Sequence, residues 1–186
     1  RAESPGPSVD KLAPTMRHSA RILYSIYIAL TLLQIALLLL GGMPLFDSVL
    51  NTFGTAGTGG FSIKNASIGA YDSAYLQAVI GVFMALFGVN FSIYYLLLLK
   101  QFRAAFRNEE LRLYVGIILL TTAVIAVDIL PQYADAGAGK AVLDSFFQVS
   151  SVMTTTGYAT ANFDKWPQLS RFLLVMLMII GASAGS

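Results

Sequence analysis

Four long apolar runs constrain this chain more than any other feature of its sequence. They cover Ile22–Leu40, Ala74–Leu99, Leu113–Leu130 and Leu169 to the end of the chain. A helix needs about 20 apolar residues to cross the hydrocarbon core of a bilayer. The chain as a whole is 56% hydrophobic and 12% charged, which is too apolar for an ordinary soluble domain. The sequence therefore predicts an all-α polytopic membrane protein with four spans.

The basic residues gather on one side of these predicted spans. Four precede the first span, within residues 1–21, and four lie at or inside the short link 101–112. The four on the other side are interspersed with six Asp residues. Because cytoplasmic loops of membrane proteins carry an excess of Lys and Arg, we expect a cytoplasmic lead-in at 1–21 and a cytoplasmic link at 101–112. Two long connections, 41–73 and 131–168, then face outward.

Each outward connection contains a short apolar stretch followed by a Thr/Gly segment. The stretch 46–54 precedes Thr55–Gly59, and the stretch 144–153 precedes Thr155–Ala159, one hundred residues further on. Such a short helix is roughly 12 Å long and cannot cross a bilayer. Irregular backbone at membrane depth is tolerated only where it is buried in protein or lines water. Each connection is therefore predicted to form a re-entrant pore loop, made of a pore helix and a filter.

The order of span, pore helix, filter and span occurs twice, over residues 22–100 and 113–186. Both loops follow a span that runs outward, so the sequence predicts tandem parallel helix–pore-loop–helix repeats, as in potassium channels. The alternative from another class is a secondary transporter with broken helices, which is expected to have inverted repeats.

The composition of the two Thr/Gly segments suits a cation filter. A dehydrated cation needs oxygen ligands, and backbone carbonyls supply them without a fixed charge that would trap the ion. Aiming successive carbonyls at one axis requires left-handed backbone, which Gly57 and Gly157 can adopt without a Cβ penalty. Thr55 and Thr155 can add a hydroxyl at the inner mouth, and the partly negative C-terminal end of each pore helix favours a cation.

Four segments carry a resemblance to a known family. They are residues 51–62 (NTFGTAGTGGFS), 90–98 (NFSIYYLLL), 154–167 (TTTGYATANFDKWP) and 181–186 (GASAGS). On these segments the chain resembles the Trk/Ktr/HKT potassium transporter family, and most closely its TrkH-type membrane subunits. The family builds one pore from four concatenated repeats, so the resemblance implies an internal fragment that holds the second and third repeats.

The resemblance also implies an activity. It is potassium uptake through a carbonyl-lined filter of the pore-forming subunit, with potassium as the transported ligand and no cofactor. A sodium-permeable or poorly selective member of the same family is the open alternative. The expected location is the bacterial inner membrane. The expected partners are the lipid bilayer, the remaining repeats of the same polypeptide, a second copy in a homodimer and a cytosolic ring of nucleotide-binding regulatory subunits.

Two sets of site residues follow from the resemblance. The first is the start of a flexible intramembrane gate loop below the filter, at Gly181, Ala182, Ser183, Ala184, Gly185 and Ser186. The second is the set of filter residues that bind potassium, at Thr55, Ala56, Gly57, Thr58, Gly59, Thr155, Thr156, Gly157 and Tyr158.

Other functions find no support in the sequence. The net charge of +2 is too small to indicate nucleic-acid binding, and a chain without Cys has no thiolate metal site. A phosphate-binding loop would require a strand before the glycines and a helix start after them. The sequence also has no nucleophile–base pair or paired carboxylates that would indicate an enzyme.

Overall fold

The computed structural model describes residues 16–57 and 67–184, and all regular elements within these ranges are helices. This agrees with the predicted all-α class. The elements are α2 (Met16–Leu40), α3 (Leu45–Ala56), η3 (Ser67–Ala70), α4 (Ala74–Phe87), α5 (Phe91–Leu98), α6 (Phe102–Phe106), α7 (Glu109–Ile129), η4 (Leu130–Tyr133), α8 (Ala138–Met153), η5 (Phe163–Lys165) and α9 (Gln168–Ala184).

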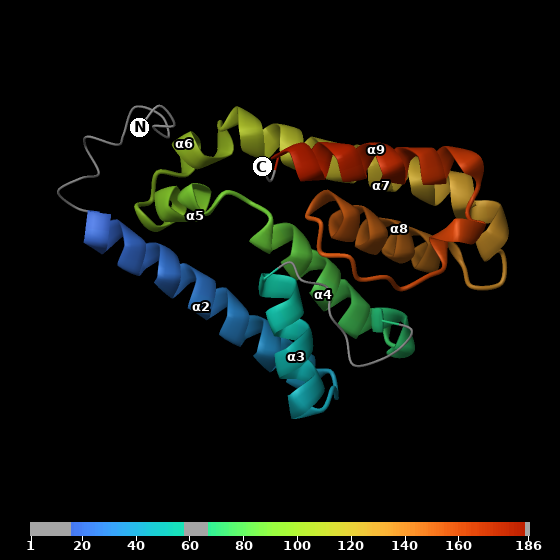
Figure 1. Cartoon of the computed structure of the whole chain (residues 1–186), viewed down its shortest axis with the longest axis horizontal. Coiled ribbons are helices and arrows are strands. Elements are labelled where there is room, and N and C mark those ends of the chain that lie inside the picture. The colour runs from blue at the N-terminus through green and yellow to red at the C-terminus, as the bar shows by residue number, and fades with distance from the viewer. Residues whose placement is uncertain (1–15, 58–66, 185–186) are drawn as a thin grey trace.

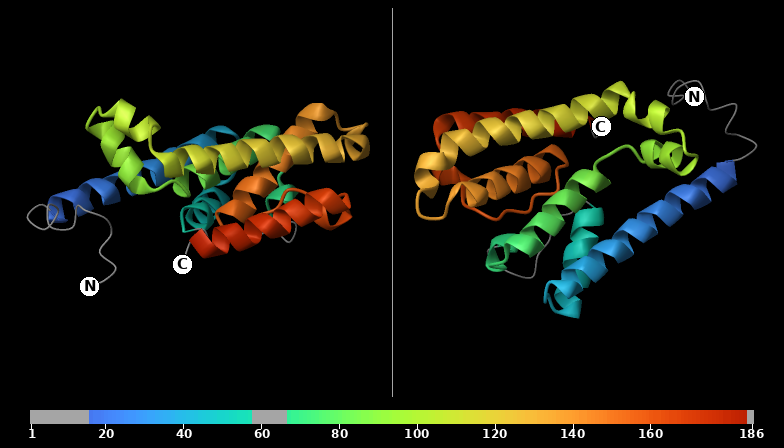
Figure 2. Two further views of the ribbon diagram at one scale, coloured as in Figure 1. Left: turned by 90° about the horizontal axis from the view of Figure 1, so that it is seen from above. Right: turned by 180° about the vertical axis from the view of Figure 1, so that it is seen from behind.

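The helices form two halves that meet along α4 and α8 (Figures 1 and 2). In the first half α2 packs against α3 and α4, and in the second half α8 packs against both α7 and α9. Each half thus contains a long apolar helix, a helix that begins in one of the two long connections, and a further apolar helix, in the same chain order.

Within the part of the chain that the structure describes, two helices are long and apolar enough to cross a membrane unaided. They lie at Arg17–Leu40 and Glu109–Tyr133, where the first and third spans were predicted, and only 17% and 28% of their most apolar windows are buried in the molecule. The remaining apolar surface requires lipid or further protein to cover it. The apolar helix α9 is shorter than these two, at 17 residues.

The second predicted span, Ala74–Leu99, is not one continuous helix. It is divided into α4 and α5, which are bent by 89° relative to each other. Asn90 is the N-cap of α5, and its side-chain oxygen accepts a hydrogen bond from the backbone N–H of Ser92. Such caps compete with continuation of the preceding helix. The periodicity of an apolar run does not reveal the break, because the residues on both sides of it are equally apolar.

Tyrosine hydroxyls satisfy backbone groups beside this break. Tyr114 of α7 donates to the carbonyl oxygen of Ala85 over 2.8 Å, and Tyr94 of α5 donates to the carbonyl oxygen of Leu86. Gly88 lies so close to the Tyr114 hydroxyl and to the Thr154 side chain that a Cβ atom would clash with both. The break is therefore packed into the junction between the two halves.

Among the described residues the apolar core has three clusters: one in the second half, a small one of Ala56, Phe83 and Phe87 in the first half, and a larger first-half cluster that includes residues of the second half. The second-half cluster joins α7, α8 and α9 through residues such as Ile125, Val149 and Leu174. The larger first-half cluster takes in Phe147 and Tyr158 from the second half. Both side chains are fully buried, so the two halves share one continuous interface. The buried residues of the larger first-half cluster are Leu38, Met43, Ile68, Leu76, Ile80, Met84, Phe147 and Tyr158.

Candidate functional site

The site is built around the C-terminal ends of α3 and α8, the helices that occupy the predicted pore-helix positions. Both are longer than predicted: α3 covers Leu45–Ala56 and α8 covers Ala138–Met153, where the sequence indicated 46–54 and 144–153. Their C-terminal ends point toward the middle of the molecule (Figures 1 and 2). The partly negative ends of two helices are thereby directed to one region, which favours a cation there.

Equivalent features of α3 and α8 are 97 residues apart. Asp47 and Asp144 are both buried, and each accepts a hydrogen bond from a tyrosine hydroxyl in the long connection of its own half. The C-caps repeat at the same interval, with φ and ψ of −87° and 1° at Gly57 and of −92° and 1° at Thr154. The two halves are thus related by 97 residues at this point, whereas the Thr/Gly pattern alone indicated one hundred.

Thr55 and Ala56 are the last residues of α3 and are not in an extended segment. The hydroxyl of Thr55 donates to the Asn51 carbonyl over 2.8 Å and accepts a hydrogen bond from the side chain of Gln34 on α2. Gly57 has a φ of −87° and so does not adopt the expected left-handed conformation. The helix continues this far because the N–H of Gly57 still bonds to the Phe53 carbonyl. The predicted filter residues Thr58 and Gly59 lie outside the described residues.

The backbone of the second Thr/Gly segment, which follows α8, differs from that of Thr55–Gly57 at the end of α3. Thr155 and Gly157 both have positive φ values, of 58° and 93°, so the left-handed backbone expected at Gly157 is present. A positive φ is uncommon for a residue with a side chain such as Thr155. Thr155 and Gly157 are exposed, while Thr156 and Tyr158 are buried. The chain therefore presents alternate residues to open space at the end of α8.

Tyr158 connects the second Thr/Gly segment to α3 and to α8 by hydrogen bonds. Its side chain is fully buried, and its hydroxyl donates to the carbonyl oxygen of Asn51 in α3 over 2.9 Å. Its own carbonyl oxygen accepts a hydrogen bond of 2.7 Å from the hydroxyl of Ser151 in α8. Just beyond it, the Ala159 carbonyl accepts the backbone N–H of Gly69 from η3. The segment is therefore held by elements of both halves.

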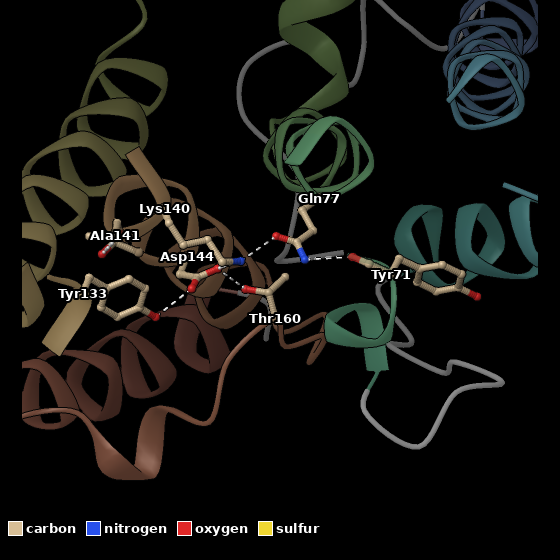
Figure 3. Close-up of polar contacts among 8 residues, drawn as sticks. Tyr71, Gln77, Tyr133, Lys140, Ala141, Asp144 and Thr160 are labelled. Carbon is tan, nitrogen blue, oxygen red and sulfur yellow. Dashed lines mark hydrogen bonds and ion pairs between the residues drawn. The ribbon is translucent and has the colours of Figure 1, made fainter. Parts of the chain in front are cut away.

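An outer polar network joins the two halves a second time (Figure 3). Asp144 is 2% exposed and accepts hydrogen bonds from Tyr133, Lys140 and Thr160 at 2.6, 3.0 and 2.9 Å. Lys140 also donates to the side-chain oxygen of Gln77 on α4 over 3.1 Å. Since Thr160 follows the second Thr/Gly segment, the network ties the outer end of that segment to α8 and α4.

The network continues from Gln77 to the first short helix. The Gln77 amide donates to the backbone carbonyl of Tyr71 over 3.0 Å, and the Tyr71 hydroxyl donates to Asp47 over 2.9 Å. Burial raises the pKa of the Tyr71 hydroxyl above its ordinary value of 10.0, and the Asp47 carboxylate raises it further while a hydrogen bond with Asn51 lowers it. Asp47 and Asp144 are thus connected through Tyr71, Gln77 and Lys140.

The hydrogen bonds that join these residues were not predicted from the sequence. Two signals in the sequence could have indicated them: the i, i+4 spacing of Lys140 and Asp144 on one helix face, and the Asp-Ser pairs at residues 47–48 and 144–145. Gln77 offers no comparable signal, because its partners come from other elements. Within the described residues, no group of three or more His, Asp or Glu side chains could hold a metal ion.

A cavity of about 480 Å³ adjoins the start of the second Thr/Gly segment and is lined on one side by α7. The break between α4 and α5, the end of α8 and the end of α9 contribute to its walls. Its lining includes Gly88, Asn90, Tyr114, Thr154, Thr155 and Gly181.

The predicted gate loop begins at the edge of this cavity. Gly181 through Ala184 continue α9 as a helix, whereas Gly185 and Ser186 lie outside the described residues. Gly181 lies against the Met153 carbonyl, where a Cβ atom would be too close. The start of the predicted gate loop is therefore in contact with the end of α8.

Apolar helices with large uncovered faces, which surround shorter helices rich in buried polar groups, define this chain as a helical membrane protein. The family model that matches it is TrkH, described as a cation transport protein, and the match covers residues 1–186. The chain belongs to the TrkH family of cation transport proteins, as the resemblance indicated.

Individual relatives agree with this membership. The chain is 35% identical over 189 residues to the Trk system potassium uptake protein TrkH of Salmonella typhimurium, covering 100% of this chain and 39% of that protein. It is 32% identical over 191 residues to the Trk system potassium uptake protein TrkG of Escherichia coli K12, with 100% and 38% covered. The chain thus spans about two fifths of the length of these relatives.

A solved structure has the same fold. The crystal structure of the potassium transporter TrkH from Vibrio parahaemolyticus matches with a TM-score of 0.79 and 26% sequence identity. The match covers 91% of this chain and 37% of that chain.

Proposed function

We propose that the chain forms part of the pore of a Trk-type potassium uptake system and contributes two quarters of a carbonyl-lined filter. The observation that carries the proposal is the backbone at the end of α8. Thr155 and Gly157 take left-handed conformations there, which is the alternation needed to direct successive carbonyls at one axis. The curated relatives named above are potassium uptake proteins, which supports potassium as the transported ion.

The 97-residue relation between α3 and α8 refines the assignment of the filter. Thr155 is the first residue after the α8 cap at Thr154, and the corresponding residue after the α3 cap at Gly57 is Thr58. We therefore place the start of the first filter segment at Thr58, three residues later than the sequence pattern indicated. Thr55 then serves to pack α3 against α2. In the second segment, Thr155, Thr156 and Gly157 supply the ion ligands.

Two quarters of a filter cannot enclose an ion, so the proposed assembly needs further parts. The other two quarters come from the remaining repeats of the same polypeptide. Residues 1–21 and 101–112 face the cytoplasm of a bacterial cell, and the segment 181–186 gates the path below the filter. A homodimer and a cytosolic ring of nucleotide-binding subunits complete the system. Conduction of sodium in place of potassium is the alternative activity at the same site.

Growth of a potassium-uptake-deficient bacterium tests the proposal. The full-length polypeptide that contains this chain is expected to restore growth at low potassium, and Gly157→Asp is expected to abolish the rescue. Gly137→Asp is the matched control, because Gly137 also has a positive φ, of 97°, and open space around its Cα, but it lies at the start of α8. If the Gly157→Asp protein restores growth as well as the Gly137→Asp protein does, the filter role of Gly157 is contradicted.

Fluxes of rubidium and sodium into vesicles then separate the two activities. A rubidium flux well above the sodium flux supports potassium uptake, and equal fluxes would show that the pore does not discriminate.

A further inference from the structure

We propose that Tyr158 is a positioning residue that sets the ion selectivity of the pore, and that its carbonyl is not an ion ligand. This inference rests on the proposed function, since it concerns the same filter. It departs from the expectation that Tyr158 binds potassium together with its three predecessors.

The orientation of its carbonyl group is the first observation. The Tyr158 carbonyl oxygen accepts a 2.7 Å hydrogen bond from the Ser151 hydroxyl, and the Ser151 side chain is fully buried within α8. The oxygen is thus directed back at its own short helix. The carbonyl groups that face an ion have to point the other way, into the pore.

The contact of its hydroxyl group is the second observation. The Tyr158 hydroxyl lies 2.9 Å from the carbonyl oxygen of Asn51, a residue 107 positions earlier in the chain. Asn51 belongs to α3, the short helix of the other half. One side chain therefore links the second filter segment to the helix that carries the first, at a buried site where a hydrogen bond is not weakened by water.

The surroundings of the ring explain why this link is rigid. The Tyr158 ring is fully buried in the cluster that contains Ile80 and Met84 of α4 and Phe147 of α8. Side chains in such a close-packed setting sit in rotamer minima and interdigitate with their neighbours. Coordinating groups need to be held within about 0.5 Å of their productive positions. Tyr158 accordingly sets the distance between the second filter segment and α3, and discrimination between cations of different size depends on this distance.

Paired flux measurements on variants of the full-length polypeptide in vesicles test this inference. Tyr158→Phe keeps the ring and removes the hydroxyl, and the ratio of rubidium to sodium flux is expected to fall about fivefold, in keeping with the loss of one buried hydrogen bond. Tyr75→Phe is the matched control, because the Tyr75 hydroxyl also donates to a helical carbonyl, that of Leu37, but away from the Thr/Gly segments. The control is expected to keep the wild-type ratio.

Ser151→Ala provides a second, independent readout if Tyr158→Phe does not assemble. It frees the Tyr158 carbonyl and is expected to lower the same flux ratio. An unchanged ratio in whichever of the two variants assembles overturns the inference while leaving the proposed function intact. Absence of rubidium uptake by the wild-type protein would instead overturn the proposed function, and the inference with it.

Discussion

The ammonium group of Lys140 lies 3.1 Å from the side-chain oxygen of Gln77, and this contact joins α8 of one half to α4 of the other. The same ammonium group pairs with the buried Asp144 at 3.0 Å. A single lysine thus neutralises a buried carboxylate within α8 and connects that helix to α4.

Replacement of Lys140 by Met is expected to lower stability. Asp144 would keep its hydrogen bonds from Tyr133 and Thr160 but would lose its cation. A buried charge left without its partner is costly, although Lys140 is 35% exposed and water can compensate in part. We expect a loss of about 1–2 kcal/mol in the free energy of unfolding. Thermal unfolding in detergent measures it.

Lys165→Met is the control for this prediction, because Lys165 is exposed on η5 and its side chain is not part of the network. A Lys140→Met protein that unfolds at the same temperature as Lys165→Met would show that the Lys140–Asp144 pair contributes nothing.

Gly88→Ala is expected to disturb the base of the second Thr/Gly segment. The added methyl group would meet the Tyr114 hydroxyl and the Thr154 side chain. Overpacking of this kind costs about 1–3 kcal/mol, and uptake should decline because Thr154 directly precedes the filter. In contrast, Gly116→Ala on α7 adds a methyl group in open space and should leave uptake and stability unimpaired. This prediction is tested by measuring rubidium uptake by the two variants at equal expression; equal uptake would contradict it.

Thr55→Val tests where the first filter segment begins. The Thr55 hydroxyl bonds to Gln34 and to the Asn51 carbonyl, and its side chain is fully buried. Its removal should cost about 1–2 kcal/mol of stability and leave the rubidium-to-sodium flux ratio unchanged. Thr155→Val, at the exposed start of the second segment, should alter that ratio. A changed ratio in Thr55→Val would restore Thr55 to the filter.

The contribution of Tyr71 to stability should depend on pH in one direction. The pKa of Tyr71 is raised in the folded protein above its ordinary value of 10.0, chiefly by burial. The folded state therefore favours the protonated hydroxyl, so this stabilisation is fully present below pH 10 and is lost as the pH rises through the folded pKa. The difference in unfolding free energy between wild type and Tyr71→Phe should be constant from about pH 7 to 9 and shrink above about pH 10. If the difference in unfolding free energy grows above pH 10, the pKa of Tyr71 is not raised in the folded protein.

Much of the architecture could be predicted from local composition. Residues 22–40 and 113–130 are apolar for about the length that a bilayer demands, and their helices are present where expected. Gly157 could be placed in left-handed backbone because no other residue adopts that conformation at so little cost. The family resemblance could also be recognised, since its motifs are short and contiguous.

The break after Phe87 and the exact register of the two halves could not be predicted in the same way. The break is stabilised in part by the hydroxyl of Tyr114, which comes from another helix. The Thr/Gly pattern suggested an interval of one hundred residues, because Thr55 and Gly57 mimic the spacing of Thr155 and Gly157. Hydrogen bonds that keep Thr55 within α3 decide against extended backbone there.

The sequence by itself determined that this chain is a helical membrane protein of the TrkH family with two short helices that each precede a Thr/Gly segment. These properties depend on residues that are close together in the chain, so composition and spacing reveal them. Only the tertiary structure decided which side chains join the two halves: Tyr158 to Asn51, and Lys140 to Gln77. Those contacts bring together residues 107 and 63 positions apart, and they form because polar groups buried between the two halves require hydrogen-bond partners.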